Sequence, residues 1–391
     1  MAAHAAARAA QAPPSSTGPP APRKPRPSGP VAWFCSHQLG ESLLLLLTPP
    51  PEYLESTALT PSPSFHLRNP FSRFLLLSFR KPGTSLYYKG RDDAFFIAWW
   101  VIAFGFIRDA LMRWMFVPIA RLCGIRSKRE LARFAEQGWQ LCYCSISFSI
   151  GLYINQTSEY RNLNTLYFWK GYPHDELPAL TKWYYLVYTA FWIHQIITIN
   201  LEARRRDYYQ MFTHHIITFA LMAFSYVLNW TRIGNTILCT MDLCDIFLSA
   251  AKLFKYVGKT NISDATFAVF LVTWLLTRHV IFGKILYSVV TEPQTVLEYG
   301  WRSEEGYFFS RNMQVGFALL LAALQVLMCI WLYMIFRVLY GMFLGKPADD
   351  VRSDDEGDDS LEDEPAKNGS ANGHSNGHAN GHGFKERKKD R

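Results

Sequence analysis

Long runs of apolar residues with few charges inside them constrain this chain more than any other feature. Each run is about 18 to 30 residues long, which is the length that an α-helix needs to cross a lipid bilayer. The runs lie at 94–120, 137–154, 183–201, 211–230, 234–257, 265–290 and 313–344. Because a lone strand cannot satisfy its backbone groups in lipid, every run is predicted to be helical. We therefore predict an all-α polytopic membrane protein with about seven transmembrane helices.

The segments between and around these runs divide the chain into four regions. Residues 1–63 are predicted to be a disordered N-terminal region with a short apolar segment, and residues 64–132 an interfacial segment with a leading transmembrane helix. Residues 133–345 are predicted to form a six-helix domain, and residues 346–391 an acidic, low-complexity tail. The first and last regions lack the apolar residues needed for a packed core. The apolar segment at 39–48 is too short to span and ends in three prolines. If it does cross, the chain has eight spans.

The charges favour one orientation in the membrane. The short loops at 121–133 and 203–207 are strongly basic, and short basic loops face the cytosol. A seven-helix count places both loops on one side, with the C-terminus beside them. Lys388 and Lys389 stand fourth and third from the C-terminus, the positions of a retrieval signal for the endoplasmic reticulum. We predict a multi-pass protein of that membrane with a cytosolic C-terminus.

Composition argues against other classes of protein. The net charge of +8 is compatible with nucleic-acid binding, but the basic residues sit at the ends of the apolar runs, where the orientation rule already explains them. Seven scattered cysteines give neither a disulfide framework nor a metal-binding spacing. Aromatic residues gather near the ends of runs and are predicted to form interfacial belts; examples are Trp183, Tyr184, Tyr185, Trp230 and Trp331.

Two neighbouring runs carry polar residues at helical spacing. In the run 211–230, one face holds His214, Thr218 and Ser225, while His215 lies about 100° around the helix from His214. The run 234–257 holds a stripe spaced three, four and three residues apart, formed by Asp242, Asp245, Ser249 and Lys252. The connection between the two runs is short, so we expect antiparallel neighbouring helices whose histidine and aspartate faces meet.

This pairing of residue types is typical of a proton-transfer site. Placing an ionisable group inside a span costs about 2.5 to 3.5 kcal/mol on insertion scales, so such a residue is expected to have a structural or functional role. A carboxylate beside an imidazole fixes the ring and stabilises its protonated form, as in base-assisted acyl transfer. The alternative is interhelical hydrogen bonding worth about 0.6 kcal/mol. Two histidines with two aspartates on facing stripes favour function.

The basic residues at the mouth of the histidine helix have two interpretations. His214 would lie only ~10 Å from the cytosolic helix end, at 1.5 Å per residue. A water-soluble acyl donor could reach that depth with its head group outside. The phosphates of such a donor could meet the cations at this mouth, which are Arg204, Arg205 and Arg206. They could equally serve only to set the orientation of the helices.

The stretch "RRRDYYQMFTHHIITFALMAFSYVLNWTRIGNTILCTMDLCDIFLSAAKLFKY" at 204–256 resembles the signature of ceramide synthases, the longevity-assurance branch of the TLC-domain family. The resemblance is to the fungal type and runs from about 133 to 340, and "YYKGRDDAFF" at 87–96 is similar to the segment preceding the domain. It implies six helices in a barrel-like bundle around an acyl-chain tunnel, after one leading helix. It also implies transfer of a fatty acyl group from acyl-CoA to the amine of dihydrosphingosine or phytosphingosine.

The resemblance assigns expected roles to the polar stripes. His214 and His215 match the paired histidines of the family, and Asp242 and Asp245 match its two aspartates. We expect these four to be catalytic, with Asp245 orienting the active imidazole. Substrate contacts are expected from Thr218, Ser225, Ser249, Lys252, Arg204, Arg205 and Arg206. Acyl-CoA is the expected co-substrate, with no other cofactor and no metal ion.

Further expectations concern partners and modifications. A sphingoid base and membrane lipid are expected ligands, and the resemblance implies a homo- or heterodimer and a small regulatory subunit. Asn155 and Asn229 begin glycosylation sequons on the predicted luminal side. Ser353 and Ser360 precede acidic residues, so they are either sites for an acid-directed kinase or part of a plain acidic linker.

Three other classes of function use some of the same residues. A proton-coupled transporter could use the histidines and aspartates as a relay, but paired repeats and broken helices are not evident. A di-metal lipid hydroxylase or desaturase needs more histidine-rich boxes than this sequence offers. A non-catalytic TLC-domain scaffold would not need all four residues, so the presence of His214, His215, Asp242 and Asp245 argues against it.

Overall fold

The computed structural model describes residues 72–202 and 207–343. Every apolar run predicted to be a span falls on a helix or on consecutive helical segments. Five runs correspond to single helices, which are α7 (Lys128–Thr157), α8 (Ala179–Leu201), α9 (Tyr208–Val227), α10 (Thr231–Tyr256) and α14 (Arg311–Phe343). The segment 39–48 and the tail from 346 lie outside the described residues.

Two further runs form continuous helical stretches with a wider π-helical turn inside. The first is α5 (Asp93–Ala110), η1 (Leu111–Phe116) and α6 (Val117–Leu122). The second is α11 (Thr260–Leu275), η4 (Leu276–Ile281) and α12 (Phe282–Thr291). Pro118 has no N–H to bond back to the preceding turn, which accounts for the widened turn before it. A π-helical turn is frequent at functional sites, and η4 carries Arg278.

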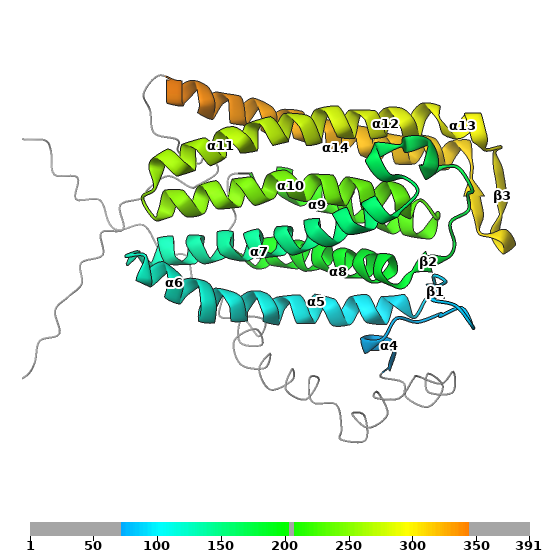
Figure 1. The fold of residues 1–391 in the computed structure, drawn as a ribbon, viewed down its shortest axis with the longest axis horizontal. Coiled ribbons are helices and arrows are strands. Elements are labelled where there is room, and N and C mark those ends of the chain that lie inside the picture. The colour runs from blue at the N-terminus through cyan, green and yellow to red at the C-terminus, as the bar shows by residue number, and fades with distance from the viewer. Residues whose placement is uncertain (1–71, 203–206, 344–391) are drawn as a thin grey trace, which may run out of the picture.

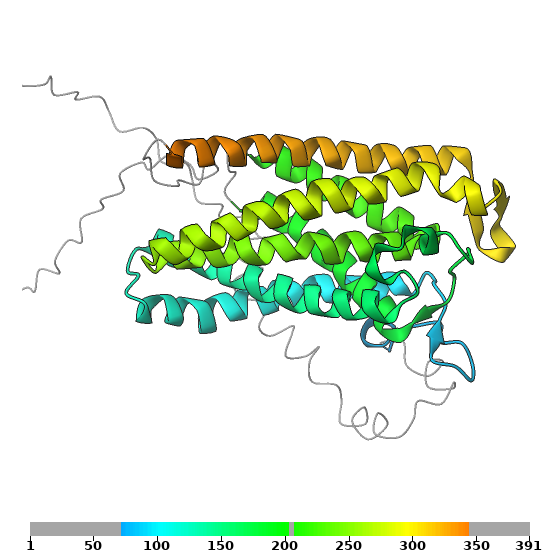
Figure 2. The ribbon, with the colours of Figure 1, turned by 45° about the horizontal axis from the view of Figure 1, so that its top comes forward.

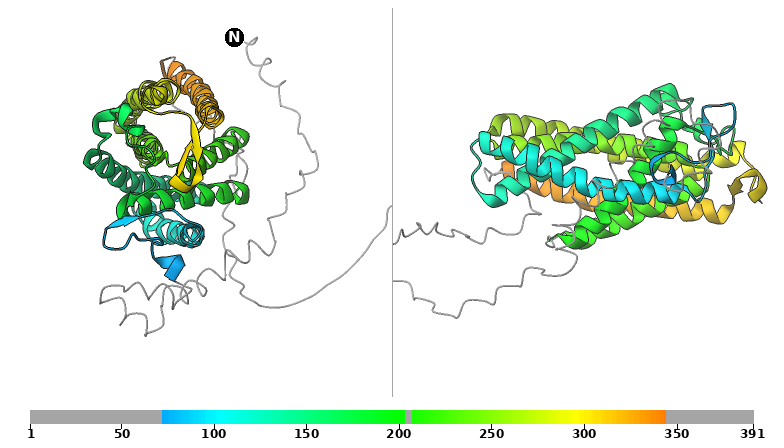
Figure 3. Two further views of the ribbon diagram at one scale, coloured as in Figure 1. Left: turned by 90° about the vertical axis from the view of Figure 1, so that its right-hand side faces the viewer. Right: turned by 90° about the horizontal axis from the view of Figure 1, so that it is seen from below.

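The helices run lengthwise beside one another (Figures 1 and 2). From α7 onward, the contacts around the bundle are α7 with α8, α8 with α9, α9 with α14, α14 with α12, α11 with α10, and α10 with α7, and α10 also contacts α9 and α12. Helix α5 lies outside this set and packs against α8, while η1 packs against α7. Figure 3 shows the helices end-on. Through these contacts of α5 and η1, the leading helix is attached to α8 and α7, the first two helices of the six-helix domain.

Three helical stretches are long and apolar enough by themselves to cross a membrane. They are Asp93–Leu122, Thr260–Thr291 and Arg311–Gly341, among the residues that were placed. The chain is thus a membrane protein by its described helices. Helices α7, α8, α9 and α10 have 30, 23, 20 and 26 residues. At 1.5 Å per residue each reaches about 30 Å, the thickness of the apolar bilayer core.

The two ends of the bundle differ. At the end that we call the strand end, β1 (Leu86–Tyr87) pairs with β2 (Leu177–Pro178), and β3 (Gly300–Arg302) pairs with β4 (Tyr307–Phe309), both antiparallel. The short helices α4 (Ser72–Leu75), η2 (Arg161–Leu163), η3 (Thr165–Phe168), α13 (Pro293–Val296) and η5 (Ser303–Glu305) complete the described structure. The opposite end, where α6, α8, α10 and α14 end, we call the tail end.

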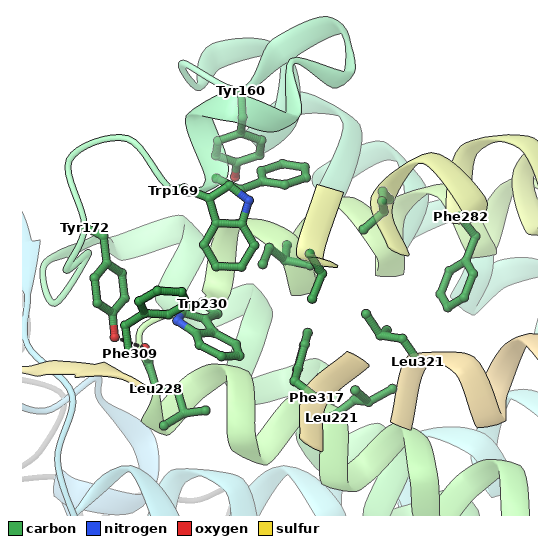
Figure 4. Packing of buried hydrophobic residues seen from close by; sticks show 14 of the residues in the cluster. Tyr160, Trp169, Tyr172, Leu221, Leu228, Trp230, Phe282, Phe309, Phe317 and Leu321 are labelled. Atoms are coloured by element: carbon green, nitrogen blue, oxygen red, sulfur yellow. Dashed lines mark hydrogen bonds between the residues drawn. The ribbon is translucent and has the colours of Figure 1, made fainter. Parts of the chain in front are cut away.

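Several aromatic residues expected in interfacial belts lie in the core instead. Trp230 is only 1% exposed and Tyr185 is fully buried. The Trp230 ring lies 5.1 Å from Phe317 and 5.7 Å from Trp169, between centroids, and Figure 4 shows this packing. The prediction was wrong for these residues because their large rings fill the space between packed helices, where aromatic pairs add about 0.5–1.5 kcal/mol each.

A buried ion pair ties the segment before α5 to the bundle. Lys182 on α8 is fully buried, and its Nζ donates to the backbone oxygens of Ser78 (2.8 Å) and Tyr88 (2.7 Å). The same Nζ lies 2.7 Å from Asp93 Oδ1. The other oxygen of Asp93 accepts a hydrogen bond of 2.7 Å from the hydroxyl of Tyr226 on α9. The Lys182 ammonium therefore has two backbone acceptors and one ion-pair partner, and the segment 78–93 is held against α8 and α9.

The asparagines of both predicted glycosylation sequons make tertiary contacts, and Asn229 is buried whereas Asn155 is half-buried. Asn229 is 4% exposed; its Nδ2 donates to the Gly306 oxygen (2.8 Å), and its Oδ1 accepts from Lys89 Nζ (2.5 Å). The Asn155 amide donates to the Gly151 oxygen (2.9 Å) and accepts from the hydroxyl of Thr236 (3.1 Å). In the folded protein these two amides are committed to tertiary contacts, so Asn229 in particular is inaccessible to a glycosyl donor.

Lys89 gives the strand end a pH-dependent stability. Burial lowers the pKa of Lys89 from its usual value near 10.5 to about 7. The negative charges of Asp175 and Asp93 oppose this decrease, and the positive charge of Lys182 adds to it. Between these two values the unfolded chain binds more protons than the folded one, so the contribution of Lys89 to stability rises with pH from about 7 upward. Below pH 7 both states are protonated and the contribution is flat.

We therefore expect the unfolding midpoint of the wild type to rise relative to that of Lys89→Gln as the pH increases above 7. The measurement is thermal unfolding of the detergent-solubilised proteins from pH 6 to pH 9. Curves that stay parallel over this whole range would contradict the assignment to Lys89.

Candidate active site

The two predicted histidines of α9 lie against the same tryptophan. The ring of Trp192 on α8 is 5.3 Å from the ring of His214 and 5.2 Å from that of His215, between centroids. The two imidazoles are 5.6 Å apart. His214 also contacts Trp331 on α14, at 5.2 Å. The sequence predicted that the two rings point in different directions, and Trp192 lies where both can still reach it.

The two aspartates of α10 have different partners. Asp242 is buried, and its Oδ1 accepts a hydrogen bond of 2.5 Å from the hydroxyl of Tyr188 on α8. Asp245 is partly exposed, and its Oδ1 accepts from Arg278 Nη2 at 2.9 Å. Each carboxylate is therefore oriented by one specific donor from another helix.

Residues of α8 connect the histidines to Asp242. Tyr188 and Trp192 are four residues apart on α8, so they share one face of that helix. Tyr188 contacts Asp242 and Trp192 contacts both imidazoles. The sequence did not identify Tyr188 or Trp192, although their spacing of four within an aromatic-rich helix was a signal that could have been used.

Arg278 is the other residue of the site that the sequence left unassigned. Its side chain is 7% exposed and lies inside the protein. Besides its bond to Asp245, the guanidinium stacks on the Trp274 ring at 4.3 Å. Trp274 in turn lies 6.5 Å from Trp331, which contacts His214. A continuous set of side chains thus joins Asp245 to His214.

Two details of the predicted site differ from the structure. Asp245 was expected to orient an imidazole, but its described partner is Arg278. The Nδ1 atoms of His214 and His215 are buried and have no hydrogen-bond partner among the described residues. Helices α9 and α10 were expected to be antiparallel neighbours and do contact each other, although α9 packs more extensively against α8 and α14, and α10 against α7 and α11.

The residues predicted to contact substrate are placed unevenly. Thr218 and Ser225 of α9 are buried; Ser225 bonds to the hydroxyl of Tyr185 and to the Met222 oxygen (3.0 Å), and the Thr218 hydroxyl has no partner among the described residues. Ser249 of α10 is buried, and Lys252 is half-buried nearer the tail end. Arg204, Arg205 and Arg206 lie outside the described residues.

The arrangement can carry out proton transfer and nucleophilic chemistry away from water. Two imidazoles with unbonded Nδ1 atoms are connected, through Tyr188, Trp192, Trp331 and Trp274, to two carboxylates and a guanidinium that are already oriented. An imidazole of this kind can remove a proton or attack an activated carbonyl. A fixed arginine can stabilise developing negative charge. Among the described residues, no group of three or more histidine, cysteine, aspartate or glutamate side chains is placed to hold a metal ion.

Comparison with known proteins adds an independent finding. The sequence model of the family described as TLC domain matches residues 133–337. Sphingosine N-acyltransferase lag1 of Schizosaccharomyces pombe is 41% identical over 285 residues, covering 73% of each chain. Ceramide Synthase FUM18 of Gibberella moniliformis is 35% identical, again covering 73% of each chain. Ceramide synthase LAG1 of Saccharomyces cerevisiae is 34% identical over 74% of this chain and 70% of its own.

Proposed function

Because this chain belongs to the TLC-domain family, we propose that it is a ceramide synthase, an acyltransferase that joins a fatty acyl group from acyl-CoA to the amine of a sphingoid base. In the reaction an amide bond forms, the thioester bond breaks, and CoA leaves as its thiol. Dihydrosphingosine and phytosphingosine are the expected acceptors. The curated relatives are named for this activity, and the alternatives of a transporter or scaffold have no comparable support.

One observation assigns the proposed reaction to specific residues. The paired imidazoles of His214 and His215 lie within the membrane domain with unbonded Nδ1 atoms. A protonated amine is no nucleophile, so the reaction needs a base, and an imidazole is the usual one. His214 either removes this proton or attacks the thioester to give an acyl-imidazole. His215 assists it or donates to the oxyanion.

The carboxylates support this chemistry in different ways. Asp242 is held by Tyr188, whose helix also presents Trp192 to both imidazoles. Asp245 holds Arg278, and we assign to this pair the role of a fixed charge facing the reacting carbonyl. Thr218, Ser225, Ser249 and Lys252 are proposed to contact substrate, with acyl-CoA phosphates meeting Arg204, Arg205 and Arg206 at the tail end.

The fold fits an enclosed acyl-chain site. The packing of α7, α8, α9, α14, α11–α12 and α10, each against the next, supports a closed ring of six helices around an acyl-chain tunnel, preceded by α5. We propose seven spans in all, in the membrane of the endoplasmic reticulum. The basic connections 121–133 and 203–207 support a cytosolic tail end, and Lys388 and Lys389 support retrieval. A second subunit remains part of the proposal.

The full-length purified protein tests the proposal directly. It is incubated in lipid vesicles with a panel of acyl-CoAs and dihydrosphingosine, and the products are identified by mass spectrometry. We expect ceramide to form together with an equal amount of free CoA. Movement of protons or sphingoid base across the vesicle membrane, without N-acylation, would contradict the proposal and favour a transporter.

A further inference from the structure

A polar cavity lies at the strand end, outside the active site. It has a volume of about 570 Å³ and lies between the loop that follows α7 and the last turns of α12. This volume is within the range of about 300–1,000 Å³ found for small-molecule sites. The charged side chains in its lining are Glu159, Arg161, Lys284 and Glu292. None of these residues belongs to the proposed catalytic group.

After the contacts among its lining residues are taken into account, the cavity has one region with unpaired positive charge and one with unpaired negative charge. Glu159 is paired with Arg232, at 3.1 Å. Lys284 Nζ donates only to a neutral group, the backbone oxygen of Leu163, at 2.9 Å. Arg161 is exposed and has no ion pair with any placed residue. Arg161 and Lys284 therefore present uncompensated positive charge, a combination suited to a phosphate group.

The anionic part is the carboxylate of Glu292. Its Oε1 accepts a hydrogen bond from the Thr165 hydroxyl (2.7 Å), and its Oε2 accepts from the Ser288 hydroxyl (2.6 Å). These neutral donors fix the orientation of the carboxylate without cancelling its charge, and no cation pairs with it in the part of the chain that the structure describes. A ligand with an ammonium group would supply the missing positive charge.

The loop that lines the cavity contains two residues in an unusual backbone conformation. Asn162 and Leu163 adopt left-handed conformations, with φ of 59° and 56°. Asparagine adopts this conformation readily, whereas in leucine it costs of order 1–3 kcal/mol, and such strained residues cluster at functional sites. The bond from Lys284 to the Leu163 oxygen holds this turn against α12.

The surface below the cavity is apolar. Val272, Leu276 and Val280 precede Lys284 at intervals of four residues, and all three are exposed, by 64%, 49% and 62%. Tyr287 follows one turn later, 67% exposed, as aromatic residues do where a helix leaves the bilayer core. A stripe facing the lipid chains therefore ends at the cation and the cavity. A molecule lying here would have its chains along the stripe and its polar group in the cavity.

From these observations we propose that the cavity binds the headgroup of a zwitterionic phospholipid bearing a primary amine. The phosphodiester lies at Arg161 and Lys284, the ammonium lies at Glu292, and the acyl chains follow Val280, Leu276 and Val272. The site is independent of the acyl-transfer reaction and requires only that the helices stand in a membrane.

Native mass spectrometry of the full-length protein tests this site. The purified protein is offered phosphatidylethanolamine, phosphatidylcholine and phosphatidylglycerol with identical acyl chains, and retained lipids are counted. We expect phosphatidylethanolamine to be retained best. Arg161→Gln or Lys284→Gln should weaken its retention about tenfold or more, as expected for losing a charge-assisted hydrogen bond. Glu292→Gln should remove the preference over phosphatidylglycerol while leaving phosphate binding.

The matched control is Arg311→Gln, which removes one exposed cation at the same end of the bundle but outside the cavity. It should retain lipid as the wild type does. Equal retention of all three lipids by the wild type and all variants would overturn the proposal. Displacement of the lipid by glycerophosphoethanolamine or inorganic phosphate at similar concentrations would also overturn it, because the site would then take soluble phosphate. Unfolding midpoints of each variant identify any loss caused by misfolding.

Discussion

Replacing His214 with alanine is expected to lower ceramide formation by about 10²- to 10⁴-fold, the usual contribution of a general acid–base group. The substitution removes an imidazole whose Nδ1 has no partner in the described protein and which lies between Trp192 and Trp331. No hydrogen bond of the described fold is lost with it, so the unfolding midpoint should change far less than the rate. Activity is measured as N-acylated product from purified protein.

His279→Ala is the matched control for this experiment. His279 also lies in one of the apolar runs, but its described hydrogen bond is to Gln325 on α14 and not to a residue of the proposed catalytic group. It should keep most of the activity. Intact-mass measurement of wild type with acyl-CoA alone then separates the two roles of His214, because only an acyl-imidazole adds the mass of the acyl group. Unimpaired ceramide formation by His214→Ala would reject the assignment.

Replacing Arg278 with methionine is expected to destabilise the protein strongly as well as inactivate it. The change leaves Asp245 without its cation; breaking one side of a fully buried ion pair costs about 3–5 kcal/mol, and the cost here is expected to be lower because the Asp245 side chain is 33% exposed. The double variant Asp245→Asn/Arg278→Gln carries no unpaired charge. It should recover much of the stability lost in Arg278→Met while remaining inactive, because the fixed charge is still absent. Thermal unfolding and product formation are measured in parallel.

The exposed pair of Arg113 and Asp109 provides the comparison. Their side chains are 64% and 51% exposed at a separation of 2.8 Å, and such surface pairs contribute about 0–1 kcal/mol. Arg113→Met should therefore leave both the unfolding midpoint and the activity nearly unchanged. If Arg278→Met is as mild as Arg113→Met, or if the double variant regains activity, the proposed role of the Asp245–Arg278 pair is wrong.

The sequence predicted the helices and the two polar stripes well because both depend on local periodicity. The apolar runs locate α5 to α14, and the spacing of His214, Asp242 and Asp245 marks faces of α9 and α10. Membership of the family follows from the long motif around these residues, and the comparisons confirm it.

The partners of those residues could not be predicted, since they come from helices distant in sequence. Asp245 and Arg278 are 33 residues apart, and Tyr188 and Asp242 are 54 apart. A single cation in an apolar run fits a snorkelling residue as well as a buried one. Tyr185 and Trp230 likewise stand near the ends of runs, and only the packing of the helices shows that they are interior residues.

The buried ammonium of Lys182 determines where the independently folding unit begins. Its acceptors belong to Ser78, Tyr88 and Asp93, all upstream of residue 133, at which the family match starts. Cutting the chain at that match would remove these three partners together, so the ammonium would lose its ion pair and both of its backbone acceptors. A polypeptide that keeps the full set of contacts around Lys182 therefore extends at least to Ser78, and the leading helix belongs to the folded enzyme together with the TLC domain.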